Sequence, residues 1–143
     1  MSEMPKSNRP FAISLIAAIN GIAALLHLSF WVLAFIKLPP FGSPSTIAER
    51  ISLATTYGFG IADLIWSFPF LFLGSILLLK NYLLGWLCAH FANVLYWYSF
   101  TVIVTRDSAA GSLSPGTILF LPFAVFAFWA AYSLWKNRYH FME

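Results

Sequence analysis

Residues 51–79 read ISLATTYGFGIADLIWSFPFLFLGSILLL, an apolar stretch whose single charged side chain is Asp63. A helix needs about 20 apolar residues to cross the hydrocarbon core of a bilayer, and this stretch is longer. Because hydrocarbon does not solvate a carboxylate, Asp63 has to face other protein groups or water. The stretch therefore predicts a transmembrane helix with one costly polar group, which needs a partner or a function.

Three other stretches of the chain are similarly apolar. We expect the four spans to run over about 11–37, 55–79, 82–105 and 116–136. Hydrophobic residues make up 60% of the 143 residues and charged residues 9%, whereas about a quarter of the residues in a soluble domain are charged. The connections are too short for a soluble domain. The sequence therefore predicts an all-α fold, in which residues 1–143 form one integral membrane domain, a four-helix transmembrane bundle with up-down-up-down topology.

The helix that contains the second span is predicted to be longer than the bilayer core is thick. Thr46 and Glu49 have the spacing of a capping box, so a helix can start there. A helix from Thr46 to Lys80 would be roughly 50 Å long, against roughly 30 Å for the hydrocarbon core. We expect the surplus to stand outside the bilayer, or to form a short amphipathic helix on its surface that bends near Gly58 and Gly60. A polar loop is expected over residues 106–115.

Basic residues lie at the ends of the spans, as membrane proteins favour. With the N-terminus inside, five fall on the inner side and three on the outer side: Lys6, Arg9, Lys80, Lys136 and Arg138 against Lys37, Arg50 and Arg106. This bias predicts both termini in the cytoplasm and a location in the cell membrane, or the inner membrane if the source is bacterial. The first apolar run is too long for a signal peptide, so we expect it to be retained. No basic face indicates a nucleic-acid partner.

Polar side chains inside the spans fall on one face of each helix, beside small or aromatic residues. A rise of 1.5 Å per residue places His27 roughly 4–5 Å and Asp63 roughly 6 Å outside the membrane midplane, so the two lie nearly level. Such stripes are expected to face the interior of a bundle. The candidate ligand-binding or proton-handling residues are Asp63, His27, Asn93, Asn20, His90, Trp97 and Ser67.

His27 and Asp63 are expected to form a hydrogen-bonded or ionic pair at the base of a pocket that opens outward, because a charge in a low dielectric favours such a partner. The pair could bind a cationic or hydrogen-bonding ligand, or pass a proton. A purely structural hydrogen bond between helices, worth about 0.6 kcal/mol on average, is the alternative. Pro69 and Pro122 each free a carbonyl near this level, which favours a cavity there.

No catalytic motif occurs in the chain, so no catalytic residue is assigned and a protein without enzymatic activity is expected. No group of histidines, cysteines and carboxylates has metal-ligand spacing, and the lone Cys88 excludes an internal disulfide. Haem held by His27 and His90 would require the two side chains at one level of the bundle, but they differ in depth by roughly 10 Å. We therefore expect no cofactor.

Three hypotheses follow for the function. The first is a small integral membrane protein that binds or transports a small ligand or a proton through a polar pocket centred on Asp63 and His27. The second is a non-catalytic accessory subunit whose polar stripes face the helices of a partner. The third is a membrane-embedded enzyme that uses the same pair as acid and base on a lipid or isoprenoid. Because four helices enclose little volume, the expected partners are membrane lipids and either a homo-oligomer or a larger membrane complex.

Overall fold

A computed structural model describes residues 9–142, which form helices and no strands. Four helical runs are long and apolar enough to cross a membrane. The first run is α1 (Phe11–Lys37), and the second consists of three continuous elements, α2 (Ile47–Ala62), η1 (Asp63–Ser67) and α3 (Phe68–Leu79). The third run is α4 (Leu83–Ala110) and the fourth is α5 (Pro115–Lys136). A short 3-10 helix, η2 (Arg138–Phe141), follows the fourth run. The predicted all-α fold with four such helices is confirmed.

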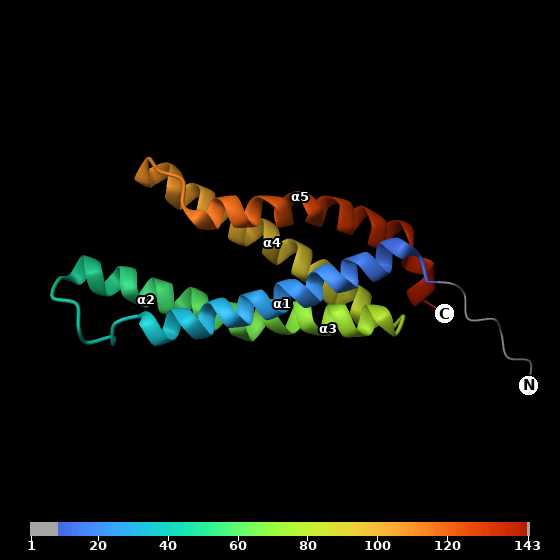
Figure 1. Ribbon diagram of the computed structural model, residues 1–143, viewed down its shortest axis with the longest axis horizontal. Helices are drawn as coiled ribbons and strands as arrows, with labels where there is room; N and C mark the ends of the chain where they lie inside the picture. The colour runs from blue at the N-terminus through green and yellow to red at the C-terminus, as the bar shows by residue number, and fades with distance from the viewer. Residues whose placement is uncertain (1–8, 143) are drawn as a thin grey trace, which may run out of the picture.

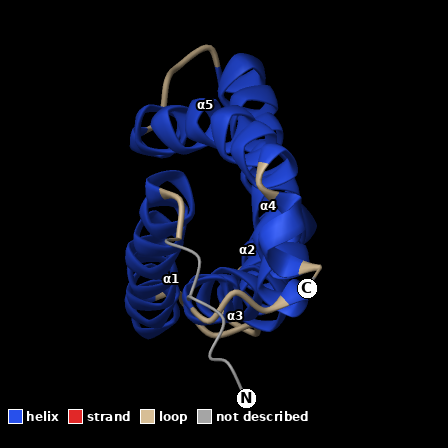
Figure 2. Cartoon of the chain, turned by 90° about the vertical axis from the view of Figure 1, so that its right-hand side faces the viewer, coloured by secondary structure: helices blue, strands red, loops and turns tan. Residues whose placement is uncertain are grey.

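The helices form two arms that are joined at one end of the molecule (Figure 1). α1 packs along α3, α3 along α4, and α4 along α5. The α1–α2 arm and the α4–α5 arm diverge toward the end that carries the connections 38–46 and 111–114, which we call the loop end (Figure 1). The start of α1 and the end of η2 lie at the opposite, terminal end. Seen along the molecule, the helices make an open ring (Figure 2).

The predicted capping box opens α2. Thr46 Oγ1 accepts a 3.2 Å hydrogen bond from the Glu49 backbone N–H, and the Glu49 carboxylate accepts one of 3.2 Å from the Thr46 N–H. The chain stays helical from Ile47 to Leu79 without a break at Gly58 or Gly60. The expectation that the first turns of this run stand outside the bilayer or lie on its surface stays a prediction.

The irregular turn of the second span is η1, a π-helix in which the Phe68 N–H donates to the Asp63 carbonyl. Pro69 follows directly. Its ring has no N–H and clashes with the carbonyl four residues earlier, which disturbs a regular α-turn. The wider π-turn accommodates the proline without ending the helix, and π-turns of this kind frequently mark functional sites.

α4 is longer than expected and continues to Ala110, so most of the loop expected over 106–115 is helical. The helix ends in a Schellman motif, with Gly111 in the left-handed region at φ 64°. The Ser112 N–H donates to the Asp107 carbonyl (3.2 Å), and the Gly111 N–H donates to the Ser108 carbonyl (3.3 Å). Only residues 111–114 are left to connect α4 with α5.

The buried core has two clusters, separated along the helices. A terminal cluster consists of Ile13, Ile16, Ala17, Leu78, Ala89, Ala130, Leu134 and Phe141. A central cluster consists of Ala23, Ala24, Leu71, Ala92, Tyr96 and Ala127. Many members are alanines, and small residues let helices approach closely in a membrane. Gly74 shows the same device, since a Cβ there would lie 3.2 Å from the Ala89 backbone.

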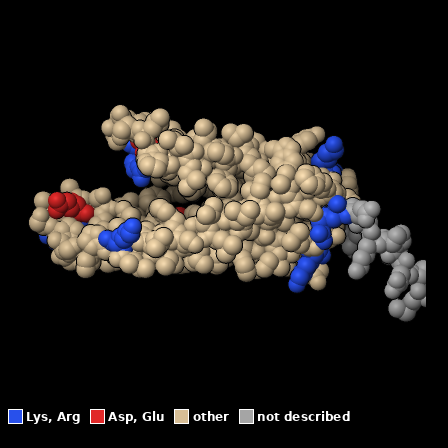
Figure 3. All heavy atoms as spheres, in the orientation of Figure 1, with Lys and Arg blue, Asp and Glu red and all other residues tan. Residues whose placement is uncertain are grey.

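The outer surface of the four helices is apolar. Several large apolar side chains are at least two-thirds exposed, among them Phe11, Ile36, Leu113 and Ile118. Other large apolar side chains along the spans are exposed to a lesser degree. Lysine and arginine gather at the two ends of the molecule and leave a band without basic residues between them (Figure 3). An apolar band of this extent is unfavourable in water and matches the interior of a bilayer. These features suggest an integral membrane protein.

Candidate functional site

Asp63, the first residue of η1, is held by side chains from α1 and from its own helix. Trp31 Nε1 donates a 2.9 Å hydrogen bond to Asp63 Oδ2, and Ser67 Oγ donates one of 2.9 Å to Oδ1. His27 Nε2 lies 3.2 Å from Oδ2, an ion-pair distance, although the ring is not aligned for a hydrogen bond. The structure thus brings together Asp63, His27 and Ser67.

Local helix geometry explains this arrangement. His27 and Trp31 are four residues apart on one face of α1, and Asp63 and Ser67 are four apart on the facing helix. Gly60, one turn before Asp63, lets the Trp31 indole lie against α2, since a Cβ at Gly60 would stand 2.5 Å from a ring carbon of Trp31. The indole can therefore reach the carboxylate only because residue 60 has no side chain.

The carboxylate is shielded from solvent but not sealed. Side-chain exposure is 21% for Asp63 and 13% for His27, and Trp31 is 8% exposed. A carboxylate offers about four lone-pair sites, and among the described residues only Ser67 donates a hydrogen bond to Oδ1. Asp63 therefore keeps capacity for a further donor or a positive charge, on the side where it is partly exposed.

A pocket of about 400 Å³ meets Asp63 between α2–η1 and α4. Its lining includes Thr55, Phe59, Asp63, Trp66, Ser67 and Tyr98. It lies between the two arms, where the surface of the molecule is hollowed (Figure 3). Trp66 and Tyr98 stand at its rim, since both are more than half exposed. The pocket thus has a mainly apolar and aromatic wall with a single carboxylate, the composition expected of a small-ligand site.

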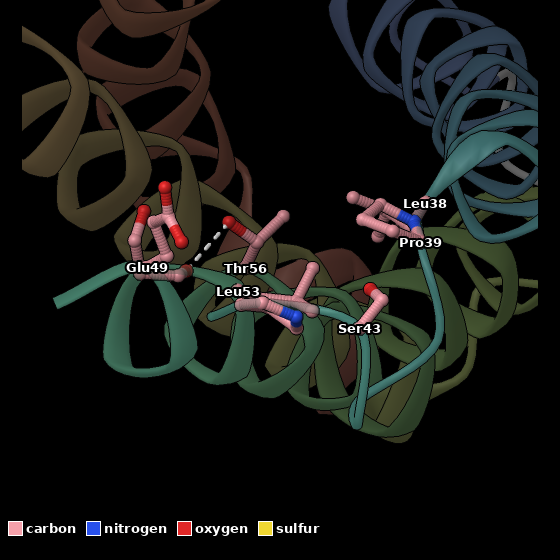
Figure 4. A pocket seen from close by; sticks show the side chains of 8 residues that line it. Leu38, Pro39, Ser43, Glu49, Leu53 and Thr56 are labelled. Carbon is pink, nitrogen blue, oxygen red and sulfur yellow. Dashed lines mark hydrogen bonds between the residues drawn. The ribbon is translucent and has the colours of Figure 1, made fainter. Parts of the chain in front are cut away.

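A second pocket, of about 460 Å³, lies at the loop end beneath the connection 38–46 (Figure 4). Its polar groups are already used: Ser43 Oγ donates to the Pro40 carbonyl (2.7 Å), Thr56 Oγ1 donates to the Ser52 carbonyl (3.0 Å), and Glu49 belongs to the capping box. Because its polar side chains stabilise local backbone, this pocket is a weaker candidate than the one at Asp63.

Asn20 and Asn93 lie deeper in the bundle. They are 0% and 1% exposed, and neither side chain has a hydrogen-bond partner among the described residues. Along α1, Asn20 lies between Ala17 of the terminal cluster and Ala23 of the central cluster. Along α4, Asn93 lies between Ala89 of the terminal cluster and Tyr96 of the central cluster. None of the hydrogen bonds of Asp63 involves these two buried asparagines, and we refer to them together as the inner polar level.

His90 and Trp97, also predicted as site residues, serve the contact between α4 and α5. Trp97 Nε1 donates to the Ala124 carbonyl on α5 (3.1 Å). His90 stands edge-on to Trp86 at 4.3 Å between ring centroids, and Trp86 in turn donates to the Leu134 carbonyl (3.0 Å). The structure brings neither residue into contact with Asp63. His27, whose Nε2 faces Asp63, and His90 therefore lie in different surroundings.

Two residues were not predicted as site residues. Trp31 lies four residues after His27 on α1, and this spacing is a signal for the same site. Asp107 was expected in a loop, but it is 4% exposed and its Oδ2 accepts hydrogen bonds of 2.6 Å from the Ser114 N–H and from Thr117 Oγ1. Its Oδ1 contacts Arg106 at 3.0 Å. Asp107 thus caps the start of α5 and has a structural role.

Comparison of the chain with protein-family models, with curated proteins and with solved structures gave no match. Within residues 9–142, no group of three or more histidines, cysteines and carboxylates is placed to hold a metal ion. The case for a function therefore depends on the geometry around Asp63.

Proposed function

We propose that this chain is an integral membrane protein that binds a small ligand in the pocket beside Asp63, without catalysing a reaction on it. In this proposal the four apolar helices cross the bilayer in up-down-up-down order, with both termini in the cytoplasm. The loop end then faces the outer side. The pocket opens between arms that diverge toward this end, so the ligand enters from the outer half of the membrane.

One observation carries the proposal: a partly exposed carboxylate forms part of the wall of a pocket inside an apolar span. Placing Asp at the centre of a membrane helix costs about 2.5–3.5 kcal/mol on insertion scales. The bonds from Trp31 and Ser67 offset part of that cost. A carboxylate with only a structural role is expected to be fully enclosed by its hydrogen-bond partners. Asp107 is enclosed in this way, since its side chain is held by Ser114, Thr117 and Arg106 and it is 4% exposed. Asp63 instead keeps one-fifth of its side chain exposed.

The pair of His27 and Asp63 could also couple ligand binding to proton transport. The imidazole of His27 can carry a proton, and its Nε2 lies 3.2 Å from the carboxylate that would hold the ligand. Binding at Asp63 and proton exchange at His27 would therefore influence each other. Transport across the whole membrane would also involve the inner polar level of Asn20 and Asn93. A homo-oligomer or a larger complex would supply the part of the pathway wall that four helices do not form.

Native mass spectrometry of the protein purified in dodecyl maltoside tests the proposal. The wild-type protein is expected to carry a small-molecule adduct, and Asp63→Asn is expected to lose it while remaining folded. Glu49→Gln is the matched control, since it makes the same acid-to-amide change on α2 outside the Asp63 pocket. Glutamine also retains the capping box.

An adduct that survives in Asp63→Asn, or absence of any adduct from the wild-type protein, would contradict ligand binding at Asp63. Co-purification of a larger membrane protein in a fixed ratio, lost on substitution of Trp66 or Tyr98 at the pocket rim, would favour the accessory-subunit hypothesis instead. The observation that supports this second candidate is the hollow in the surface between the diverging arms, which a partner could occupy (Figure 3).

A further inference from the structure

We propose that the Asp63 pocket takes a monovalent organic cation, a substituted ammonium, and that this cation exchanges with a proton on His27. The inference depends on the ligand pocket proposed above and names its ligand class. It is carried by three features of the site: its charge, the composition of its wall and the short distance between His27 and Asp63.

The site has one negative charge and no fixed positive charge beside it. No lysine or arginine occurs in residues 51–79, and within residues 9–142 the only basic side chain in contact with Asp63 is His27. α3 has no charged residue, α5 has only Lys136 at its terminal end, and the Arg106 side chain of α4 contacts Asp107. The titratable group that α4 adds to the pocket is the Tyr98 phenol. When His27 is neutral, the site therefore needs one positive charge.

The wall of the pocket selects the kind of cation. Phe59, Trp66 and Tyr98 present aromatic rings, and such rings attract ammonium groups through their negative faces. A hard metal ion such as Ca²⁺ requires about 6–8 oxygen ligands, whereas this pocket offers the Asp63 carboxylate, the hydroxyls of Thr55 and Ser67 and the Tyr98 phenol. A trimethylammonium group carries its positive charge inside a shell of methyl groups and needs no set of oxygen ligands. Such a group can contact the aromatic rings and the carboxylate of this pocket at the same time.

His27 competes for the same carboxylate. With a protonated imidazole 3.2 Å from Oδ2, the pair is neutral and the site no longer needs a cation. Binding of an ammonium beside Asp63 would then leave one excess positive charge in an apolar span, which is strongly unfavourable. The imidazolium therefore releases one proton to the buffer as the cation enters, and the net charge of the site is unchanged. By linkage, acid weakens cation binding to the same extent.

Isothermal titration with choline tests this inference, with 3,3-dimethyl-1-butanol as the uncharged isostere. The wild-type protein in dodecyl maltoside is expected to bind choline at least about tenfold more tightly than the isostere, because only choline gains from the rings and the carboxylate. Titrations in two buffers of different ionisation enthalpy give the number of protons released per choline, which is expected to increase toward one as the pH is lowered. Where a proton is released, the Kd is expected to rise as the pH falls, by at most about tenfold per pH unit.

Two variants separate the parts of the inference. Asp63→Asn is expected to lose choline binding at every pH, whereas His27→Gln is expected to keep binding and lose both the proton release and the pH dependence. If Asp63→Asn fails to fold, Tyr98→Leu serves in its place, with binding weakened several-fold, and the choline–isostere comparison in the wild-type protein needs no variant. Proton release that persists in His27→Gln would contradict the exchange.

The outcomes also distinguish this inference from the function on which it depends. Equal affinity for choline and its isostere would reject the cation while leaving small-ligand binding intact. No choline binding, together with an Asp63-dependent adduct in the mass spectrum, would have the same meaning. No binding of any kind would reject both proposals. Loss of choline binding in nanodiscs of phosphatidylcholine, but not in dodecyl maltoside, would identify the lipid headgroup as the source of the ammonium.

Discussion

Trp31 and Asp63 are joined across the first two helical runs by a 2.9 Å hydrogen bond from the indole N–H to Oδ2. The indole is 8% exposed and lies against Gly60, so the bond is shielded from solvent and its geometry is fixed by packing. This single contact positions the carboxylate relative to His27 and leaves Oδ1 with one partner, Ser67. The integrity of the site should therefore depend on Trp31 as much as on the charged pair.

Trp31→Phe removes the indole N–H and keeps an aromatic ring near Gly60. A hydrogen bond to a charged group contributes about 1.5–3 kcal/mol, so the free energy of unfolding in detergent is expected to fall by about 2 kcal/mol. Trp129→Phe is the control, because this indole on α5 is 42% exposed and its expected change is small. Equal stability of the Trp31 and Trp129 variants would show that the bond to Asp63 contributes nothing.

Gly60→Ala and Gly58→Ala make the same change two residues apart on α2. A Cβ at residue 60 would clash with the rings of Trp31 and Phe35, whereas one at residue 58 meets nothing within 4 Å. Gly60→Ala is expected to displace the indole and shift the tryptophan fluorescence spectrum, and to lower stability by about 1–3 kcal/mol. Gly58→Ala is expected to be neutral or slightly stabilising. Similar behaviour of the two variants would contradict the close packing of Trp31 on α2.

Asn20→Leu and Asn93→Leu test the inner polar level. Both carboxamides are buried without a partner, and an unsatisfied buried polar group costs about 1–3 kcal/mol. Each leucine variant is therefore expected to raise the melting temperature in a thermal-unfolding assay. Asn137→Leu is the opposite control, because Asn137 Nδ2 donates a 2.8 Å bond to the Ser133 carbonyl and its loss should be destabilising. A lower melting temperature for the Asn20 and Asn93 variants would mean that their amides are satisfied in the membrane.

Asp107→Ala removes the acceptor at the start of α5. The Ser114 N–H and the Thr117 hydroxyl both lose their 2.6 Å bonds to Oδ2, and the loss of a comparable helix cap costs about 0.5–2 kcal/mol. We expect destabilisation of about 2 kcal/mol and faster hydrogen exchange of the first turn of α5. Ser108→Ala, which alters the next residue and an exposed hydroxyl bonded to its own helix, is expected to change little. Unchanged exchange in Asp107→Ala would argue against the capping role.

The features that were predictable from the sequence depend on short-range rules. Apolar run lengths gave four helices long enough to cross a membrane, and the spacing of Thr46 and Glu49 gave the capping box. The 1.5 Å rise placed His27 and Asp63 at nearly the same depth, and the two side chains lie 3.2 Å apart. Their role as ligand-binding residues stays a prediction, as does the crossing of the bilayer.

The features that were not predictable depend on tertiary contacts. Trp31 near the end of a span has the pattern of an interfacial aromatic residue, and only the missing side chain of Gly60 on another helix opens the space in which it meets Asp63. Asp107 extends α4 because groups from the next helix, Ser114 and Thr117, satisfy its carboxylate. Pro69 indicated a disturbed turn, but not that a π-helix would absorb it with no break in the helical run.

The position of a bound cation relative to Asp63 tests the central claim most directly. Crystals grown with arsenocholine, the arsenic analogue of choline, allow the cation to be located by anomalous diffraction. We expect an anomalous peak between the Asp63 carboxylate and the rings of Trp66 and Tyr98, within about 6 Å of a ring centroid. A carboxylate turned toward lipid, or a peak confined to the pocket beneath the connection 38–46 with none at Asp63, would contradict it.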